Sequence, residues 1–96
     1  MKIENENGYI KYSVSYMDEN EIVIDMVETY ERGKGTATKL IKEVIDIAAK
    51  EGKELTLCAY PQDDTIDLDT LVAIYEHLGF VSDYSDGQTT LMHYEF

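Results

Sequence analysis

The 96-residue sequence has one cysteine, one proline, no tryptophan and only eight basic residues. Cys58 has no second cysteine to pair with, which excludes an internal disulfide and makes a reducing, cytoplasmic compartment the simpler expectation. No apolar run approaches the ~18 residues of a membrane-spanning helix, and the N-terminus lacks the apolar stretch of a signal peptide. With 44% apolar residues, we expect a single compact domain over residues 1–96 and no membrane partner.

The charge is strongly acidic and unevenly distributed. Twenty acids against eight bases give a net charge of −12, which disfavours direct nucleic-acid binding. Residues 32–50 nevertheless hold five bases against two acids, a local charge of +3. This pattern indicates one bound anion and a basic partner elsewhere, although a soluble acidic surface with one basic helix face would explain it equally well.

Hydrophobic periodicity predicts a chain of short elements in an α/β (α+β) fold. Alternating residues indicate a strand, and apolar residues spaced three and four apart indicate a helix. The predicted order is β-β-α-β-α-β-β, with no repeat and no linker. The strands are expected at 8–17, 21–28, 54–60, 80–84 and 89–95, and the helices at 35–51 and 67–78.

The alternation also predicts which side chains are buried. In residues 21–28 it places Met26 on the same face as Ile22 and Ile24, with Val27 on the opposite face. Cys58 lies in an apolar strand, so we expect a small core residue there rather than a nucleophile.

A glycine-containing segment joins the second strand to the first helix. It reads Arg32-Gly33-Lys34-Gly35-Thr36-Ala37. Glycine lets the backbone approach a ligand closely, and the first N–H groups of a helix have no partner within it and favour an anion. The segment therefore suits a phosphate or pyrophosphate, although its spacing is neither that of a P-loop nor that of the dinucleotide fingerprint. Most glycine pairs before a helix are simply turns, and that interpretation stays open.

Two motifs carry a family resemblance. The pattern R32-x-x-G35-x-A37 after a strand resembles the acetyl-CoA pyrophosphate motif of the GNAT N-acetyltransferases, and IYEHLGF at 74–80 resembles their helix ending in Tyr followed by Gly-Phe. The resemblance implies a truncated form of that fold, with a mixed, mostly antiparallel sheet, splayed central strands and two helices. The usual first strand and the two helices after it are missing.

The resemblance also implies roles for individual residues. The backbone of Met26 and Val27 would pair with the pantetheine arm, and Tyr60 with Pro61 would line the other side of the cofactor groove. The side chain of Tyr75 would protonate the departing CoA thiolate, although a core tyrosine with its hydroxyl at the rim would explain this position equally well. The pyrophosphate would be held by Arg32, Gly33, Lys34, Gly35, Thr36, Ala37 and Thr38.

A base must accept the proton of an attacking amine. A lysine amine has a reference pKa near 10.4, so deprotonating it at pH 7 costs about 4.6 kcal/mol. Glu21 and Glu28 are equally ranked candidates, although a solvated carboxylate at a strand end is the commoner explanation for any single glutamate. The acids between 63 and 69 lack the glycine of a calcium loop, so we expect no metal.

A second resemblance concerns the acceptor. The opening MKI, the strand IDMVE and the run AYPQDD at 59–64 resemble phage-encoded anti-CRISPR acetyltransferases, which acetylate a lysine of a type V CRISPR effector nuclease. This implies a lysine-bearing, basic protein acceptor and a bacterial cell, with a phage or mobile element as one source of the gene. The chain could act as a monomer or a homodimer. The alternative is a non-catalytic acidic binding module, such as a DNA mimic that inhibits a basic partner.

Overall fold

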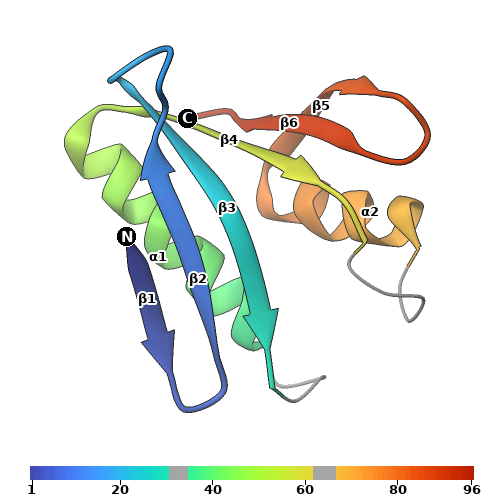
Figure 1. Ribbon diagram of the computed structural model, residues 1–96, viewed down its shortest axis with the longest axis horizontal. Coiled ribbons are helices and arrows are strands. Elements are labelled where there is room, and N and C mark those ends of the chain that lie inside the picture. Colours follow the sequence, from blue (N-terminus) through green and yellow to red (C-terminus); the bar gives the residue numbers. More distant parts are fainter. Residues whose placement is uncertain (31–34, 62–66) are drawn as a thin grey trace. The chain divides into compact units, whose positions relative to one another are not determined.

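The computed structural model describes residues 1–30, 35–61 and 67–96 and contains six strands and two helices (Figure 1). The chain divides into two compact units, Met1–Leu55 and Thr56–Phe96, and each is described by itself. No helix among the described residues is long and apolar enough to cross a membrane. The predicted arrangement as one domain stays a prediction.

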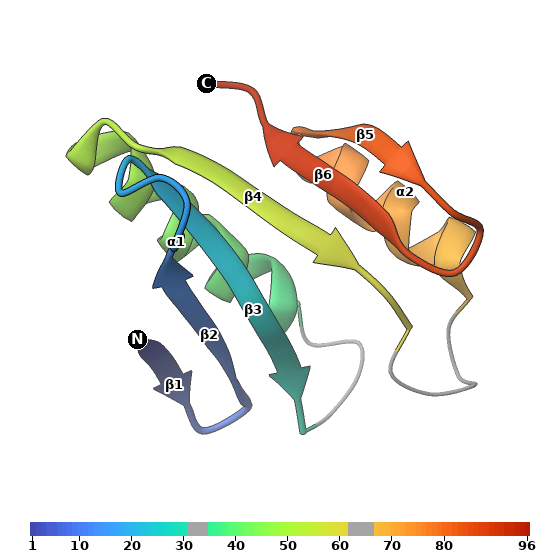
Figure 2. The ribbon, with the colours of Figure 1, turned by 45° about the horizontal axis from the view of Figure 1, so that its top comes forward.

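The first unit is a three-stranded antiparallel sheet with a helix on one face. Strands β1 (Lys2–Asn5), β2 (Gly8–Val14) and β3 (Glu21–Thr29) pair in sequence order. Helix α1 (Thr36–Glu51) packs on β2 and β3 (Figure 2). It ends at Gly52, whose left-handed φ of 67° lets its N–H bond back to the carbonyl of Ala49. The fully buried side chains of this unit include Ile10, Ile22, Leu40, Ile41 and Val44.

A β-bulge in β3 reverses the predicted faces of Met26 and Val27. Lys11 pairs with Met26, but the next residue, Tyr12, pairs with Ile24, so Asp25 is the extra residue. Ile22 and Ile24 face the core before the bulge, and Val27 takes that side after it because it pairs with buried Ile10. Strict alternation was therefore wrong beyond residue 24.

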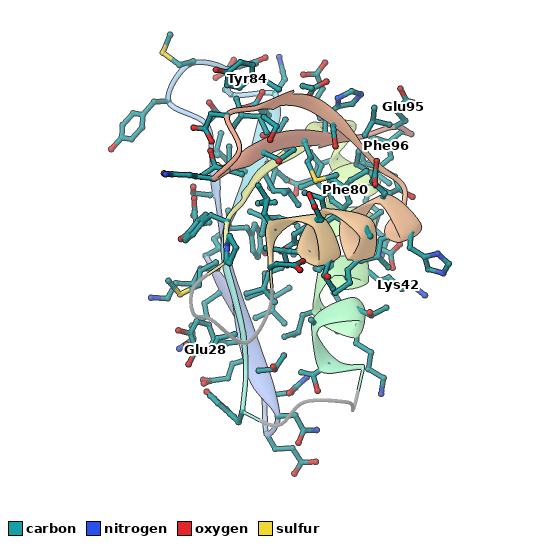
Figure 3. All side chains as sticks on the ribbon, turned by 90° about the vertical axis from the view of Figure 1, so that its right-hand side faces the viewer. Glu28, Lys42, Phe80, Tyr84, Glu95 and Phe96 are labelled. Carbon is teal, nitrogen blue, oxygen red and sulfur yellow. The ribbon has the colours of Figure 1, made fainter. Side chains whose placement is uncertain are left out.

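The second unit is also a three-stranded antiparallel sheet with one helix. Its strands β4 (Glu54–Ala59), β6 (Thr90–Tyr94) and β5 (Phe80–Ser85) pair in that order, with β4 beginning at the end of the first unit. Helix α2 (Leu68–Leu78) packs on β5 and ends at Gly79. Buried Phe80 contacts Tyr94 edge-on, with the ring centroids 5.3 Å apart. Figure 3 shows Phe80 on the helix side of the sheet and Tyr84 on the other.

The predicted α+β class, with two helices and antiparallel strand pairs, is confirmed, and three expectations are corrected. Strand β1 was not predicted, because it is only four residues long and its side chains are mostly exposed. Strand β2 ends at Val14, so Tyr16 lies in the following turn and is fully exposed. Cys58 is exposed, because it lies on the face of β4 opposite the buried Leu57 and Ala59. The splayed central strands stay a prediction.

Candidate active site

The N-terminus of α1 presents free backbone donors. Gly35 precedes the helix with φ 69° and ψ 15°, a left-handed conformation that glycine adopts without strain. Among the described residues no side chain caps this end, and the first turn contains no acidic residue. The N–H groups of Thr36, Ala37 and Thr38 therefore lack partners within the helix, and the helix dipole places partial positive charge beside them. This end of α1 can bind an anion through its backbone.

Close packing fixes that helix end to the sheet. Gly8 is buried, and a Cβ atom there would lie 3.2 Å from the Thr36 Cγ2 atom and 3.0 Å from the Thr29 Cα atom. Thr36 itself is only 4% exposed. The start of α1 thus sits directly against β2 and β3, which holds the three free N–H groups in one orientation.

Helix α2 begins in the opposite manner. The Asp67 carboxylate accepts a hydrogen bond of 2.7 Å from the Thr70 N–H, and hydrogen bonding to the side chain and then to the backbone of Thr70 lowers the pKa of Asp67 below its usual range. Asp69 adds a second negative charge in the first turn. A helix start that already carries its own anions has no need of an external one, so of the two helices among the described residues α1 is the candidate phosphate site.

The predicted cofactor residues at 32–38 are partly described. Arg32, Gly33 and Lys34 lie outside the described residues. Gly35, Thr36, Ala37 and Thr38 lie together at the start of α1. Met26 and Val27 lie in β3, directly after the bulged residue and three and two residues, respectively, before the last residue of the strand. A bulge bends the strand and turns its backbone groups locally, as strands commonly do beside active sites.

The second unit places the two predicted tyrosines close to each other. Tyr75 lies half-buried on α2, and its ring contacts Phe80 edge-on with the centroids 5.9 Å apart. Burial raises the pKa of Tyr75, and the nearby Tyr60 raises it further. The phenol is therefore protonated at neutral pH, as a proton donor must be. Tyr60 is 41% exposed and Pro61 is half-buried, so both can contact a ligand at the end of β4.

The two candidate bases lie at opposite ends of β3. Glu21 is the first residue of the strand and Glu28 its last but one, so they are seven positions apart. At roughly 3.3 Å per residue this is about 23 Å, which means that they cannot both serve one reacting amine. Glu21 is half-buried, whereas Glu28 is exposed and accepts a hydrogen bond of 2.6 Å from the Tyr9 hydroxyl.

Tyr9 is the residue that the sequence analysis missed. It was assigned to no site, although Glu28 was a candidate. The signal is the register of β2 and β3, in which Tyr9 and Glu28 are direct partners. That pairing depends on the bulge at Asp25, which the sequence does not reveal.

Comparison with known proteins identifies relatives of the whole chain. No protein-family model and no curated protein matches it. Among solved structures, the anti-CRISPR protein AcrVA5 is 40% identical, with a TM-score of 0.86 over 99% of this chain and 97% of that one.

Larger proteins share the fold at lower identity. The PaiA N-acetyltransferase of Thermoplasma acidophilum, in complex with coenzyme A, is 19% identical with a TM-score of 0.71, and the match covers 94% of this chain and 54% of that one. A Bacillus anthracis protein assigned as a streptothricin acetyltransferase, in complex with acetyl coenzyme A, is 17% identical with a TM-score of 0.72 over 94% and 56%. The chain thus spans little more than half the length of these two proteins.

Proposed function

Because the chain belongs to the GNAT N-acetyltransferase family, together with the anti-CRISPR protein AcrVA5, we propose that it transfers the acetyl group of acetyl-CoA to a protein lysine. The observation that carries this proposal is the start of α1. There a left-handed glycine and three free N–H groups, in a segment with the R-x-x-G-x-A pattern, match what a pyrophosphate requires. We further propose that Arg32, Gly33 and Lys34 complete this cradle, and that the backbone of Met26 and Val27 binds the pantetheine arm.

The chemistry needs a proton acceptor and a proton donor. The lysine amine loses its proton and attacks the thioester carbonyl, and the tetrahedral intermediate then expels the CoA thiolate. We assign the donor role to Tyr75, whose raised pKa keeps the hydroxyl protonated until the thiolate forms. Glu21 and Glu28 remain alternatives for the acceptor role, and their separation along β3 means that substitution of one should leave the role of the other unchanged.

The acceptor that we propose is a CRISPR effector nuclease in a bacterial cell. This rests on the family membership shared with an anti-CRISPR protein and on the run AYPQDD at 59–64. The net charge of −12 suits a basic acceptor, because opposite charge speeds encounter and orients the partner. Acetylation would remove one positive charge from the effector. Incubating a type V effector with the protein and acetyl-CoA, then mapping acetylated lysines by mass spectrometry, tests this step.

The cofactor site is tested by thermal unfolding with and without acetyl-CoA. At about 100 times the Kd, binding adds about 2.7 kcal/mol, which raises the melting temperature by on the order of 10 °C in a domain of this size. Gly35→Glu should remove this rise by placing a carboxylate among the free N–H groups. Gly52→Glu is the matched control, since Gly52 has nearly the same φ at the other end of α1. If the wild-type protein shows no rise, the enzyme proposal fails.

A second candidate function is a non-catalytic acidic module that blocks a basic partner, which the net charge of −12 alone would favour. It gives no role to the uncapped start of α1 or to the protonated Tyr75. It also predicts that inhibition of the partner needs no acetyl-CoA. Inhibition at full strength in the absence of acetyl-CoA would therefore favour this alternative.

A further inference from the structure

Two tyrosines and two glutamates form a cluster on one face of the first unit. The Tyr9 hydroxyl donates to Glu28 Oε2 at 2.6 Å, and the Tyr30 hydroxyl donates to Glu4 Oε2 at 3.0 Å. The two rings are tilted by 54° with their centroids 6.5 Å apart. We call these four residues the tyrosine–carboxylate cluster. Each carboxylate has one oxygen bonded to a phenol, and each glutamate is exposed.

Strand register builds this cluster. Glu4 of β1 pairs with Tyr9 of β2, and Tyr9 pairs with Glu28 of β3, so the three side chains form one row across the sheet. Tyr30 follows β3 directly and is fixed by a hydrogen bond of 2.8 Å from its N–H to the Asn7 carbonyl. The row lies on the face opposite the buried Ile10, and Figure 3 shows Glu28 on the side of the strands away from α1.

The cluster already binds ammonium groups. The Lys2 Nζ atom lies 4.6 Å from the centroid of the Tyr9 ring and 3.7 Å from Glu4, and the Lys11 Nζ atom lies 5.8 Å from the same centroid. An aromatic ring attracts a cation over its face, and a neighbouring carboxylate adds charge attraction. Both lysines have exposed side chains on long flexible stems, so their ammonium groups can leave the ring and be solvated by water at little cost in free energy.

We infer that the tyrosine–carboxylate cluster is a binding site for a lysine side chain of the protein acceptor, which displaces Lys2 or Lys11 from the Tyr9 ring. This inference deepens the proposed function and rests on it for the identity of the partner. The exchange substitutes one ammonium group for another, so the charge of the site does not change. The Tyr9 and Tyr30 rings supply the apolar surface for the lysine stem, and Glu4 and Glu28 supply the charge.

Binding is tested on the wild-type protein by NMR with labelled tyrosine rings. The probe is the peptide acetyl-Gly-Lys-Gly-amide, and its norleucine analogue is the control, because norleucine keeps the apolar stem but has no ammonium group. We expect the ring signals of Tyr9 and Tyr30 to shift with the lysine peptide only. Tyr84 is 63% exposed and lies in the second unit, so its signals should not move. Equal shifts with both peptides, or none with lysine, would overturn the inference.

Kinetics with a longer peptide that carries two lysines separate binding from chemistry, because one lysine can occupy the cluster while the other is acetylated. Tyr9→Leu removes the ring and Glu4→Gln removes one charge, and each should raise the KM for the peptide about three- to tenfold while kcat stays within about twofold. Tyr84→Leu and Glu19→Gln are the matched controls and should leave KM unchanged. A lower kcat at constant KM in Tyr9→Leu would contradict a binding role.

The experiments also separate this inference from the proposed function. The melting-temperature rise with acetyl-CoA should be the same in Tyr9→Leu as in the wild type, because the cluster lies on the face of the sheet away from α1. If the wild type gains no stability from acetyl-CoA but its Tyr9 ring shifts with the lysine peptide, the enzyme proposal fails and the lysine site stands. If the wild type gains stability from acetyl-CoA but its Tyr9 ring does not shift with the lysine peptide, the lysine site is refuted and the enzyme proposal stands. If Tyr9→Leu does not fold, the wild-type NMR titration decides.

Discussion

The close contact between Gly8 and the start of α1 predicts that Gly8→Ala damages stability and cofactor binding together. The added Cβ would lie 3.0 Å from the Thr29 Cα atom and 3.2 Å from the Thr36 methyl group, and it would press hardest on the Glu28 carbonyl oxygen. Two of these three neighbours are backbone atoms in a paired strand, so they cannot turn aside as a flexible side chain would.

The magnitude follows from two opposing effects. Overpacking costs about 1–3 kcal/mol, and replacing glycine by alanine recovers about 0.4–1 kcal/mol by restricting the unfolded chain. A net loss of about 1–2 kcal/mol lowers the melting temperature by roughly 5–15 °C in a domain of this size. Relief of the clash also pushes Thr36 away from the sheet and reorients the free N–H groups, so the stabilisation by acetyl-CoA should shrink.

Calorimetry of Gly8→Ala and Gly87→Ala, each with and without acetyl-CoA, distinguishes a clash from simple backbone strain. Gly87 has φ +90° and open space around its Cα, so alanine there costs only the strain of a left-handed residue, about 1–2 kcal/mol. That variant should keep the full stabilisation by acetyl-CoA. A Gly8→Ala protein with the melting temperature and acetyl-CoA response of the wild type would refute the reasoning.

Three further predictions concern single side chains. Tyr75→Phe should lower kcat about 10²–10⁴-fold, because it removes the hydroxyl that donates the proton. The melting temperature should stay nearly unchanged, because the ring still contacts Phe80. Unaltered turnover would exclude Tyr75 as the acid. Asp67→Ala should lower the melting temperature at pH 7 but not at pH 2, since a carboxylate with a depressed pKa stabilises the fold only above that pKa. An equal loss of melting temperature at both pH values would contradict the capping role. The pKa of His93 is raised mainly by its 2.8 Å hydrogen bond to Asp83 and further by Glu95, so His93 should stabilise the fold fully below about pH 6.5 and progressively less as pH rises through its raised pKa. An Asp83→Asn variant should show a smaller decline in chemical denaturation, and an unchanged decline would contradict the role of Asp83.

The order of the longer elements could be predicted because their periodicity is strong. The stripe through Leu40, Ile41 and Val44 predicts a helix whatever surrounds it, and Gly52 marks its end. Strand β1 could not be predicted, since a four-residue exposed strand has almost no pattern and forms only because β2 offers an edge. The exposure of Cys58 did have a signal in the sequence, because Glu54 and Thr56 share its side of the strand, opposite the buried Leu55, Leu57 and Ala59.

The candidate site could be predicted where it depends on backbone chemistry. A glycine before a helix suits an anion site by its backbone, and Gly35 has a left-handed conformation that glycine adopts without strain; the bound anion itself stays a prediction. The partners of Glu28 could not be predicted, because they depend on strand register and on one extra residue. A family motif likewise points to Tyr75. The two causes of its raised pKa, burial and the presence of Tyr60, are known only from the folded chain.

The bulge at Asp25 gives β3 two halves with opposite phase. Before it the even-numbered residues face the core, and after it the odd-numbered Val27 does. A library of substitutions along this strand should therefore find the even-numbered positions sensitive up to residue 24. From residue 26 onward it should find the odd-numbered positions sensitive instead. A regular strand with the same sequence and no bulge would keep a single phase and would turn Glu28 toward the core and Val27 toward solvent. Deleting Asp25 should remove the bulge and leave Val27 on the core side and Glu28 on the solvent side, because Asp25 is the extra residue. The bulge in this strand, more than the identity of any one residue in it, thus decides which of its side chains can meet an acceptor.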